Sequence, residues 1–118
     1  MTLRILAVDD SRTMRDMLTI ALTGAGMEVT VAEDGVHGLE ALEAEEVPDA
    51  IISDINMPRL DGFGFIEAVR RIDRFRATPI LVLTTESAPE LKARARNAGA
   101  TGWIVKPFDP QKLVRSIH

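Results

Sequence analysis

The sequence contains no cysteine among its 118 residues. This absence excludes disulfide bonds, thiolate metal sites and cysteine nucleophiles, and it suits a reducing compartment. Long hydrophobic runs are absent too. The apolar residues Ile5 to Val8 are followed at once by Asp9 and Asp10, so the N-terminus carries no secretory signal, and no segment is long enough to span a bilayer. We therefore expect a cytoplasmic protein.

Basic residues are in the minority. The chain has 14 Lys and Arg against 18 Asp and Glu, a formal net charge of −4. Non-specific nucleic-acid binding needs a basic face, so we expect no direct nucleic-acid partner. Hydrophobic residues make up 46% and charged residues 27%, the profile of a globular chain. Without a linker, repeat or low-complexity segment, residues 1–118 are expected to form one domain.

Short apolar runs alternate with amphipathic stretches along the chain. Residues 50–52 and 80–83 are continuously apolar, which is typical of strands that are covered on both faces of a parallel sheet. The pattern predicts five strands: Arg4 to Val8, Glu28 to Ala32, Ala50 to Asp54, Pro79 to Thr84 and Gly102 to Val105.

Helical patterns separate these strands. The first helix is predicted to start near Ser11 and the second at Asp34, and the third carries Phe63, Ile66 and Val69 on one face.

The last two helices are placed by their start signals. Ser87 and Glu90 have the spacing of a capping box, and Asp109-Pro110 reads as an N-cap followed by proline in the first turn. Five alternations of strand and helix with short connections predict an α/β fold with right-handed crossovers. The expected architecture is a flavodoxin-like, doubly wound five-stranded parallel sheet in the order 2-1-3-4-5, with five helices.

Polar side chains follow four of the predicted strands. Asp9 and Asp10 come after the first strand, Asp54 closes the third, Thr84 closes the fourth and Lys106 follows the fifth. Singly, each has an ordinary structural explanation as a helix cap, a strand residue or a solvated tether. Together they are harder to explain in that way, because ligands of this architecture bind beyond the carboxyl ends of the strands.

The chemistry of this group follows from its charge. Two carboxylates about 4 Å apart repel each other by a few kcal/mol near a protein surface, so a site with three of them favours a bound cation. Oxygen ligands without cysteine or a nearby histidine select a hard ion, and Mg²⁺ is expected. With Lys106, such an ion would let the pocket accept a phosphoryl group, one Asp acting as nucleophile or base.

With these residues in this order, the sequence resembles the response-regulator receiver domain family. The resemblance covers essentially the whole chain and is closest to the family's stand-alone chemotaxis regulators. The matching motifs are Asp9-Asp10, Asp54, Met57-Pro58, Asp61-Gly62, Thr84 and Lys106-Pro107-Phe108.

The resemblance implies a role for each site residue. Asp54 would take a phosphoryl group from a phosphohistidine of a partner kinase. Asp10 and Asp54 would ligate Mg²⁺ directly, Asp9 through water, and Asn56 through its backbone carbonyl. Lys106 would pair with Asp54 and then with the phosphoryl oxygens. The protein would be a phosphoacceptor switch that catalyses only its own phosphorylation and dephosphorylation, not an enzyme.

The resemblance also implies a switch. Thr84 would donate its hydroxyl to the phosphoryl group and move the loop that begins at Thr85, and Trp103, where many relatives have tyrosine, would turn inward. Asn56 and Glu86 would influence the access of water, which suggests a short-lived phosphorylated state. The Lys106-Pro107 peptide would be cis.

The resemblance also implies binding partners. A chemotaxis-type histidine kinase is expected as phosphodonor, and a flagellar motor switch protein or another output protein would bind the fourth helix, fifth strand and fifth helix. A phosphatase is a further candidate partner.

Three other functions compete with this one. An Asp-nucleophile phosphatase would carry its acids two residues apart after the first strand, whereas Asp9 and Asp10 are adjacent. A flavin module needs a hydroxyl-rich loop there, and two aspartates would repel a phosphate. The receiver of a transcription factor usually shows acids before the aromatic residue. Residues 99–102 lack them, which favours a monomer of the chemotaxis type. A phosphate-sink role stays open, as does an isolated receiver.

The remaining candidates are assigned to the surface. His37 and His118 are expected to be exposed rather than ligands. A basic cluster after the third helix is interpreted as a solvated face, with partner docking as the alternative; it consists of Arg70, Arg71, Arg74 and Arg76.

Overall fold

A computed structural model describes residues 2–44 and 46–117, so the prediction for His118 lies outside the described residues. The strands form one parallel sheet in the order β2-β1-β3-β4-β5, which confirms the predicted fold class. The strands are β1 (Arg4–Val8), β2 (Glu28–Ala32), β3 (Ala50–Ser53), β4 (Ile80–Thr84) and β5 (Gly102–Val105).

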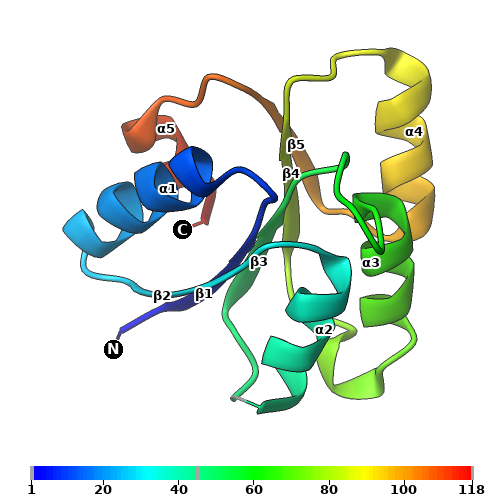
Figure 1. Cartoon of the computed structure of the whole chain (residues 1–118), viewed down its shortest axis with the longest axis horizontal. Helices are drawn as coiled ribbons and strands as arrows, with labels where there is room; N and C mark the ends of the chain where they lie inside the picture. Colours follow the sequence, from blue (N-terminus) through cyan, green and yellow to red (C-terminus); the bar gives the residue numbers. More distant parts are fainter. Residues whose placement is uncertain (1, 45, 118) are drawn as a thin grey trace.

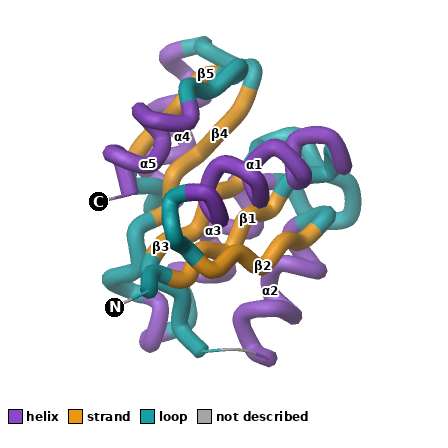
Figure 2. The backbone as a smooth tube through the Cα atoms, turned by 90° about the vertical axis from the view of Figure 1, so that its left-hand side faces the viewer, coloured by secondary structure: helices purple, strands orange, loops and turns teal. Residues whose placement is uncertain are grey.

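Helices cover both faces of this sheet. The first and last helices lie on one side and the three central ones on the other (Figure 1), and Figure 2 looks onto the side of the first and last. They are α1 (Arg12–Gly24), α2 (Gly35–Ala44), α3 (Gly62–Arg70), α4 (Pro89–Ala98) and α5 (Pro110–Ile117), with a short 3₁₀ turn, η1 (Asp73–Phe75), that the sequence did not predict. Among the described residues, no helix is long and apolar enough to cross a membrane.

Two hydrophobic cores result from the alternation of side chains along each strand. Ile5 and Ala7 of β1 pack with α1 and α5, whereas Leu6 and Val8 pack with α2, α3 and α4. Successive residues of a strand point to opposite faces, so a strand covered on both sides must be apolar throughout. This explains the continuous apolar runs from which the strands were predicted.

Four helices begin at a polar cap. Asp34 caps α2 by accepting the backbone N–H of His37 at 2.9 Å. The Ser11 hydroxyl accepts the backbone N–H of Met14 at 3.2 Å. In the same way the Asp61 carboxylate accepts the N–H of Gly64 at 2.9 Å, at the start of α3. Asp109 caps α5 by accepting the N–H of Gln111.

The predicted capping box of α4 is wrong by one residue. The N-cap is Ala88, whose side chain makes no cap hydrogen bond, and Pro89 is the first helical residue. Proline lacks an N–H and its fixed φ suits this first position, so it sets the boundary and leaves Ser87 outside the helix. Glu90 falls in the first turn, where its charge favours the positive end of the helix dipole.

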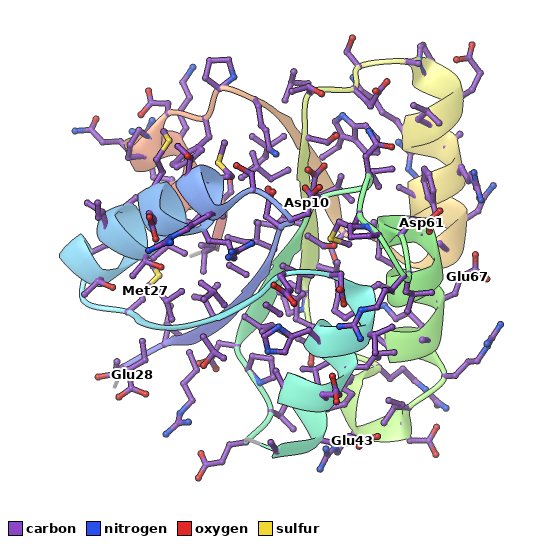
Figure 3. The ribbon with its side chains drawn as sticks, viewed as in Figure 1. Asp10, Met27, Glu28, Glu43, Asp61 and Glu67 are labelled. Atoms are coloured by element: carbon purple, nitrogen blue, oxygen red, sulfur yellow. The ribbon has the colours of Figure 1, made fainter. Side chains whose placement is uncertain are left out.

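The register of the sheet brings the carboxyl ends of its strands to one edge. Val8 pairs with Ser53, Ser53 with Val82, and Thr84 with Val105. The residues that follow these strands are therefore neighbours. Figure 3 shows Asp10 at this edge, whereas Glu28, at the start of β2, lies at the opposite edge.

Candidate functional site

The backbone holds the site residues by extending the hydrogen bonding of the strands. The N–H of Asp9 donates to the Ala32 carbonyl at 3.0 Å, and that of Asp54 to the Val8 carbonyl at 3.0 Å. These bonds fix both acids one residue beyond a buried strand. The sheet, rather than a mobile loop, therefore sets the spacing of the two carboxylates.

Lys106 bridges those two carboxylates. Its ammonium nitrogen lies 2.9 Å from Asp9 Oδ2 and 3.0 Å from Asp54 Oδ2. Its side chain is 12% exposed, and both acids are buried. The Lys106–Pro107 peptide is cis, as the resemblance implied.

The pKa values of Asp9 and Lys106 are both raised. Burial raises the pKa of Asp9 above its ordinary value, although hydrogen bonds from Lys106 and from the N–H of Ser11 oppose the shift. Burial would lower the pKa of Lys106, but the bonds to Asp9 and Asp54 outweigh it and raise that pKa. Lys106 is therefore firmly protonated at neutral pH, and the site holds a fixed positive charge.

A third carboxylate completes a set of oxygen ligands. Asp9, Asp10 and Asp54 each offer an oxygen, and these oxygens lie within 4.8 Å of one another. Three carboxylates and one ammonium leave two negative charges uncompensated, which matches a divalent cation. Oxygen-only ligands suit a hard ion, so the residues present fit Mg²⁺. Asp10 is exposed, so the site is open to solvent on the side of this residue.

Asp54 itself is oriented from two directions. Its Oδ1 accepts the backbone N–H of Ile55 at 2.7 Å, while Oδ2 faces Lys106. Asn56 follows two residues later and is exposed at the start of the β3–α3 loop. Gly62 closes that loop, and a Cβ there would lie 2.2 Å from the Asp54 carbonyl oxygen. No larger residue fits at that point unless the backbone moves.

Thr84 and Trp103 converge on the β4–α4 loop. The buried Thr84 hydroxyl accepts the N–H of Glu86 at 3.4 Å, and the Trp103 indole N–H donates to the Glu86 carbonyl at 3.0 Å. Trp103 is half-buried and packs against the core on the α2–α4 side. One residue of the loop is thus bonded both to the end of β4 and to β5.

The basic cluster after α3 is not simply a solvated face. Arg70 is half-buried, and its guanidinium donates to the carbonyls of Gly99 and Phe75 at 2.9 and 2.8 Å. Arg74 donates to the Leu42 carbonyl at 3.0 Å and lies over the ring of Phe75. These two arginines tie helix ends together. The other two are exposed and pair with acids of their own segment, as expected of a solvated face.

Sequence reasoning missed one ion pair near the site. Arg59 of the β3–α3 loop binds the buried Asp34 at the start of α2 through two hydrogen bonds. The sequence marked Asp34 as a helix start but gave no signal for its partner, because the two lie 25 positions apart. His37, one turn into α2, is exposed as predicted.

Comparisons with known proteins agree with this architecture. The family model described as "Response regulator receiver domain" matches residues 5–118. Chemotaxis protein CheY1 of Helicobacter pylori strain J99 is 40% identical over 117 residues, which is 98% of this chain and 94% of that protein.

Solved structures give the same result. Chemotaxis protein CheY4 of Vibrio cholerae has a TM-score of 0.94 and 45% identity, covering 99% of this chain and 97% of that one. The receiver domain of a sensor histidine kinase from Pseudomonas aeruginosa PAO1, with a magnesium ion coordinated in its active-site cleft, has a TM-score of 0.90 and 27% identity, covering 99% and 95%. The chain belongs to the response regulator receiver domain family.

Proposed function

We propose that this protein is a two-component response regulator that accepts a phosphoryl group on Asp54 in a Mg²⁺-dependent reaction. The observation that carries this proposal is the placement of Asp54 Oδ2 3.0 Å from the Lys106 ammonium, beside Asp9 and Asp10. A buried carboxylate needs compensating charge. Here the Lys106 ammonium supplies one positive charge, and the three carboxylates could bind a metal cation as the second.

Each site residue would have a separate role in phosphoryl transfer. An Asp54 oxygen attacks the phosphorus of a phosphohistidine; the P–N bond breaks, an acyl phosphate forms, and the histidine nitrogen keeps the electron pair and takes a proton. Lys106, now next to Asp54, would bind a phosphoryl oxygen as charge builds up there. When bound by Asp9, Asp10, Asp54 and the Asn56 carbonyl, Mg²⁺ would supply further positive charge.

Phosphorylation would act on the partner surface through Thr84 and Trp103. If Thr84 moves toward the phosphoryl group to donate its hydroxyl proton, its oxygen moves relative to the N–H of Glu86, and this movement would weaken the bond that holds the β4–α4 loop to β4. The bond from Trp103 to the Glu86 carbonyl would carry this change to β5. A phosphoryl group can shift the two conformations only by its differential affinity for them.

Water access would set how long the signal lasts. Asn56 is exposed two residues after Asp54, and Glu86 lies on the loop that Thr84 contacts. An amide and an acid near the acyl phosphate could orient an attacking water, which supports a short-lived phosphorylated state. A half-life unchanged by Glu86→Ala would remove the basis for this part.

The partners are proposed from the relatives. A chemotaxis-type histidine kinase would donate the phosphoryl group in the cytoplasm. A flagellar motor switch protein, or another output protein, would bind α4, β5 and α5 of a monomeric, single-domain receiver. The support is that both the Helicobacter pylori and the Vibrio cholerae relatives carry the name of chemotaxis proteins. A phosphate sink or the receiver of a larger regulator would use the same phosphorylation chemistry.

Intact mass spectrometry tests the proposal. The wild-type chain is incubated with acetyl phosphate in two samples, one with Mg²⁺ and one with excess chelator. The variant Asp54→Asn is treated in the same two ways. We expect one phosphoryl group on the wild type, only with Mg²⁺, and none on the variant. Equal phosphorylation of the variant would refute the assignment of Asp54.

A further inference from the structure

Arg59 has an unusual backbone conformation. Its φ is +65°, and among the described residues it is the one non-glycine with a positive φ. The N–H of Leu60 donates to the Pro58 carbonyl at 2.7 Å, which makes a tight γ-type turn with Arg59 at its centre. Residues with a Cβ disfavour this region, so the conformation persists only where the surroundings hold it.

An ion pair with Asp34 holds Arg59 in place. Arg59 Nε lies 2.8 Å from Asp34 Oδ2, and Nη2 lies 3.1 Å from Oδ1. The Asp34 side chain is 4% exposed, and it also accepts the N–H of His37 at 2.9 Å. The planar guanidinium fork fixes direction as well as distance. Asp34 is a rigid anchor because it belongs to the start of α2.

The same loop is held at two further points. The N–H of Gly35 donates to the Leu60 carbonyl at 3.2 Å, and the N–H of Gly62 donates to the Ile55 carbonyl at 2.8 Å. The second bond closes the base of residues 56–61. The ion pair and the Gly35 bond fasten the far side of that loop to α2.

We propose that the Asp34–Arg59 ion pair positions the β3–α3 loop so that the Asn56 carbonyl is held ready to bind Mg²⁺. The inference rests on the proposed function, because it takes the site to be a Mg²⁺ site. Asn56 lies inside the closed loop, three residues before Arg59. If the loop loses its anchor, it samples more conformations, and the apparent affinity falls with the fraction that is competent to bind.

The test titrates the protein with MgCl₂ alone and follows the backbone amides of residues 54–56 by NMR. Arg59→Ala and Arg59→Gly both remove the ion pair, but glycine adopts the positive φ without strain, so it keeps the experiment valid if the alanine variant folds poorly. Arg76→Ala is the matched control, because it removes an arginine–aspartate pair at η1, after α3, with the same change of charge.

We expect the dissociation constant for Mg²⁺ to rise about three- to tenfold in both Arg59 variants. This is less than the 10- to 100-fold that is typical of groups that hydrogen-bond a metal ligand directly. Arg59→Lys keeps the charge but not the fork, and it should recover only part of the affinity. Arg76→Ala should bind Mg²⁺ as the wild type does.

Hydrogen exchange supplies a readout without metal. The amides of Leu60 and Gly62 should exchange at least several times faster in the Arg59 variants than in the wild type or in Arg76→Ala. The positioning role would be overturned if Arg59→Gly bound Mg²⁺ with wild-type affinity. It would also be overturned if Arg59→Ala lost stability but kept wild-type affinity, because the ion pair would then be only structural. A wild type that does not bind Mg²⁺ would instead overturn the proposed function, and the inference with it.

Discussion

Lys106 lies between two buried carboxylates, and its ammonium contacts one oxygen of each. The same contacts raise the pKa of the lysine despite its burial, so its charge is constant across the physiological range. A constant charge is what the negative oxygens of a phosphoryl group need during transfer, since the site then requires no proton movement to stabilise them.

Replacing Lys106 by alanine should therefore slow phosphorylation strongly. We expect a decrease of about 100- to 1,000-fold in the rate with acetyl phosphate, the usual cost of removing one preorganised donor. The exposed Lys112 on α5 provides the control, because Lys112→Ala removes the same charge away from the site. A rate within about twofold of the wild type would mean that Lys106 only balances charge in the resting protein.

Asp34 gives a pH dependence with a defined sign. The hydrogen bonds from Arg59 lower the pKa of Asp34 below its ordinary value, more than burial raises it. The ionised carboxylate thus favours the folded state. Its contribution is complete above the unfolded pKa, about 4, and is lost as the pH falls through the folded value.

The difference in unfolding free energy between wild type and Asp34→Asn should accordingly be constant near neutral pH and shrink below about pH 4. Urea denaturation at a series of pH values measures it. Asp73→Asn, at an exposed pair, should show little difference at any pH. A difference for Asp34→Asn that stays the same down to pH 3 would contradict the role of the ion pair.

At the scale of the elements, the loop between β3 and α3 depends on a glycine. A Cβ on Gly62 would lie 2.2 Å from the Asp54 carbonyl oxygen and 2.8 Å from the Ile55 Cα, both backbone atoms that cannot move cheaply. A Cβ on Gly24, at the end of α1, would meet no atom within 4 Å other than those of the adjoining residues and the backbone of its own helix.

Gly62→Ala should destabilise the fold by about 1–3 kcal/mol and also displace Asp54. Gly24→Ala should change stability by less than about 1 kcal/mol, with alanine favoured if anything. Thermal or urea unfolding compares the two variants. Equal stability of both would show that the loop adapts freely, against the rigid spacing that the site requires.

Much of this architecture could be predicted from the sequence because it rests on local or periodic signals. The apolar runs predicted the buried strands, and the caps Ser11 and Asp109 predicted helix starts. The meeting of Asp9, Asp54 and Lys106 followed from parallel topology, which places strand ends at one edge.

What the sequence did not predict depends on partners far apart or on competing local signals. Asp34 and Arg59 belong to no common sequence motif, so their pairing could not be predicted. The positive φ of Arg59 could not be predicted either, because that conformation is usually found at glycine or asparagine. At the start of α4, the capping-box spacing of Ser87 predicted one N-terminus, whereas Pro89 as first helical residue sets the observed one. Arg70 looked solvated because the sequence does not show that its guanidinium reaches the carbonyl of Gly99, 29 positions away.

At the scale of the whole molecule, Glu86 connects Thr84 at the site to Trp103 on β5. Glu86 bonds through its N–H to Thr84 and through its carbonyl to Trp103. The chain has a single tryptophan, so its fluorescence reports on this junction without further labelling.

We expect Trp103 emission to change in intensity on phosphorylation, because the indole N–H would lose or alter its acceptor. Thr84→Val lacks the hydroxyl and should be phosphorylated without the same change, whereas Thr84→Ser keeps the hydroxyl and should retain most of it. Fluorescence is read at full occupancy, checked by intact mass. Unchanged emission in the fully phosphorylated wild type would argue against Trp103 as part of the switch.

The central claim is that the phosphoryl group resides on Asp54, as an acyl phosphate. The most direct measurement is reduction with sodium borohydride, which converts a phosphorylated aspartate to homoserine, followed by peptide mass spectrometry of the chain treated with acetyl phosphate and Mg²⁺. The account predicts homoserine at position 54 in the sample with Mg²⁺, and none at positions 9 or 10. Homoserine at either of those positions, or at none with the chain phosphorylated, would contradict it.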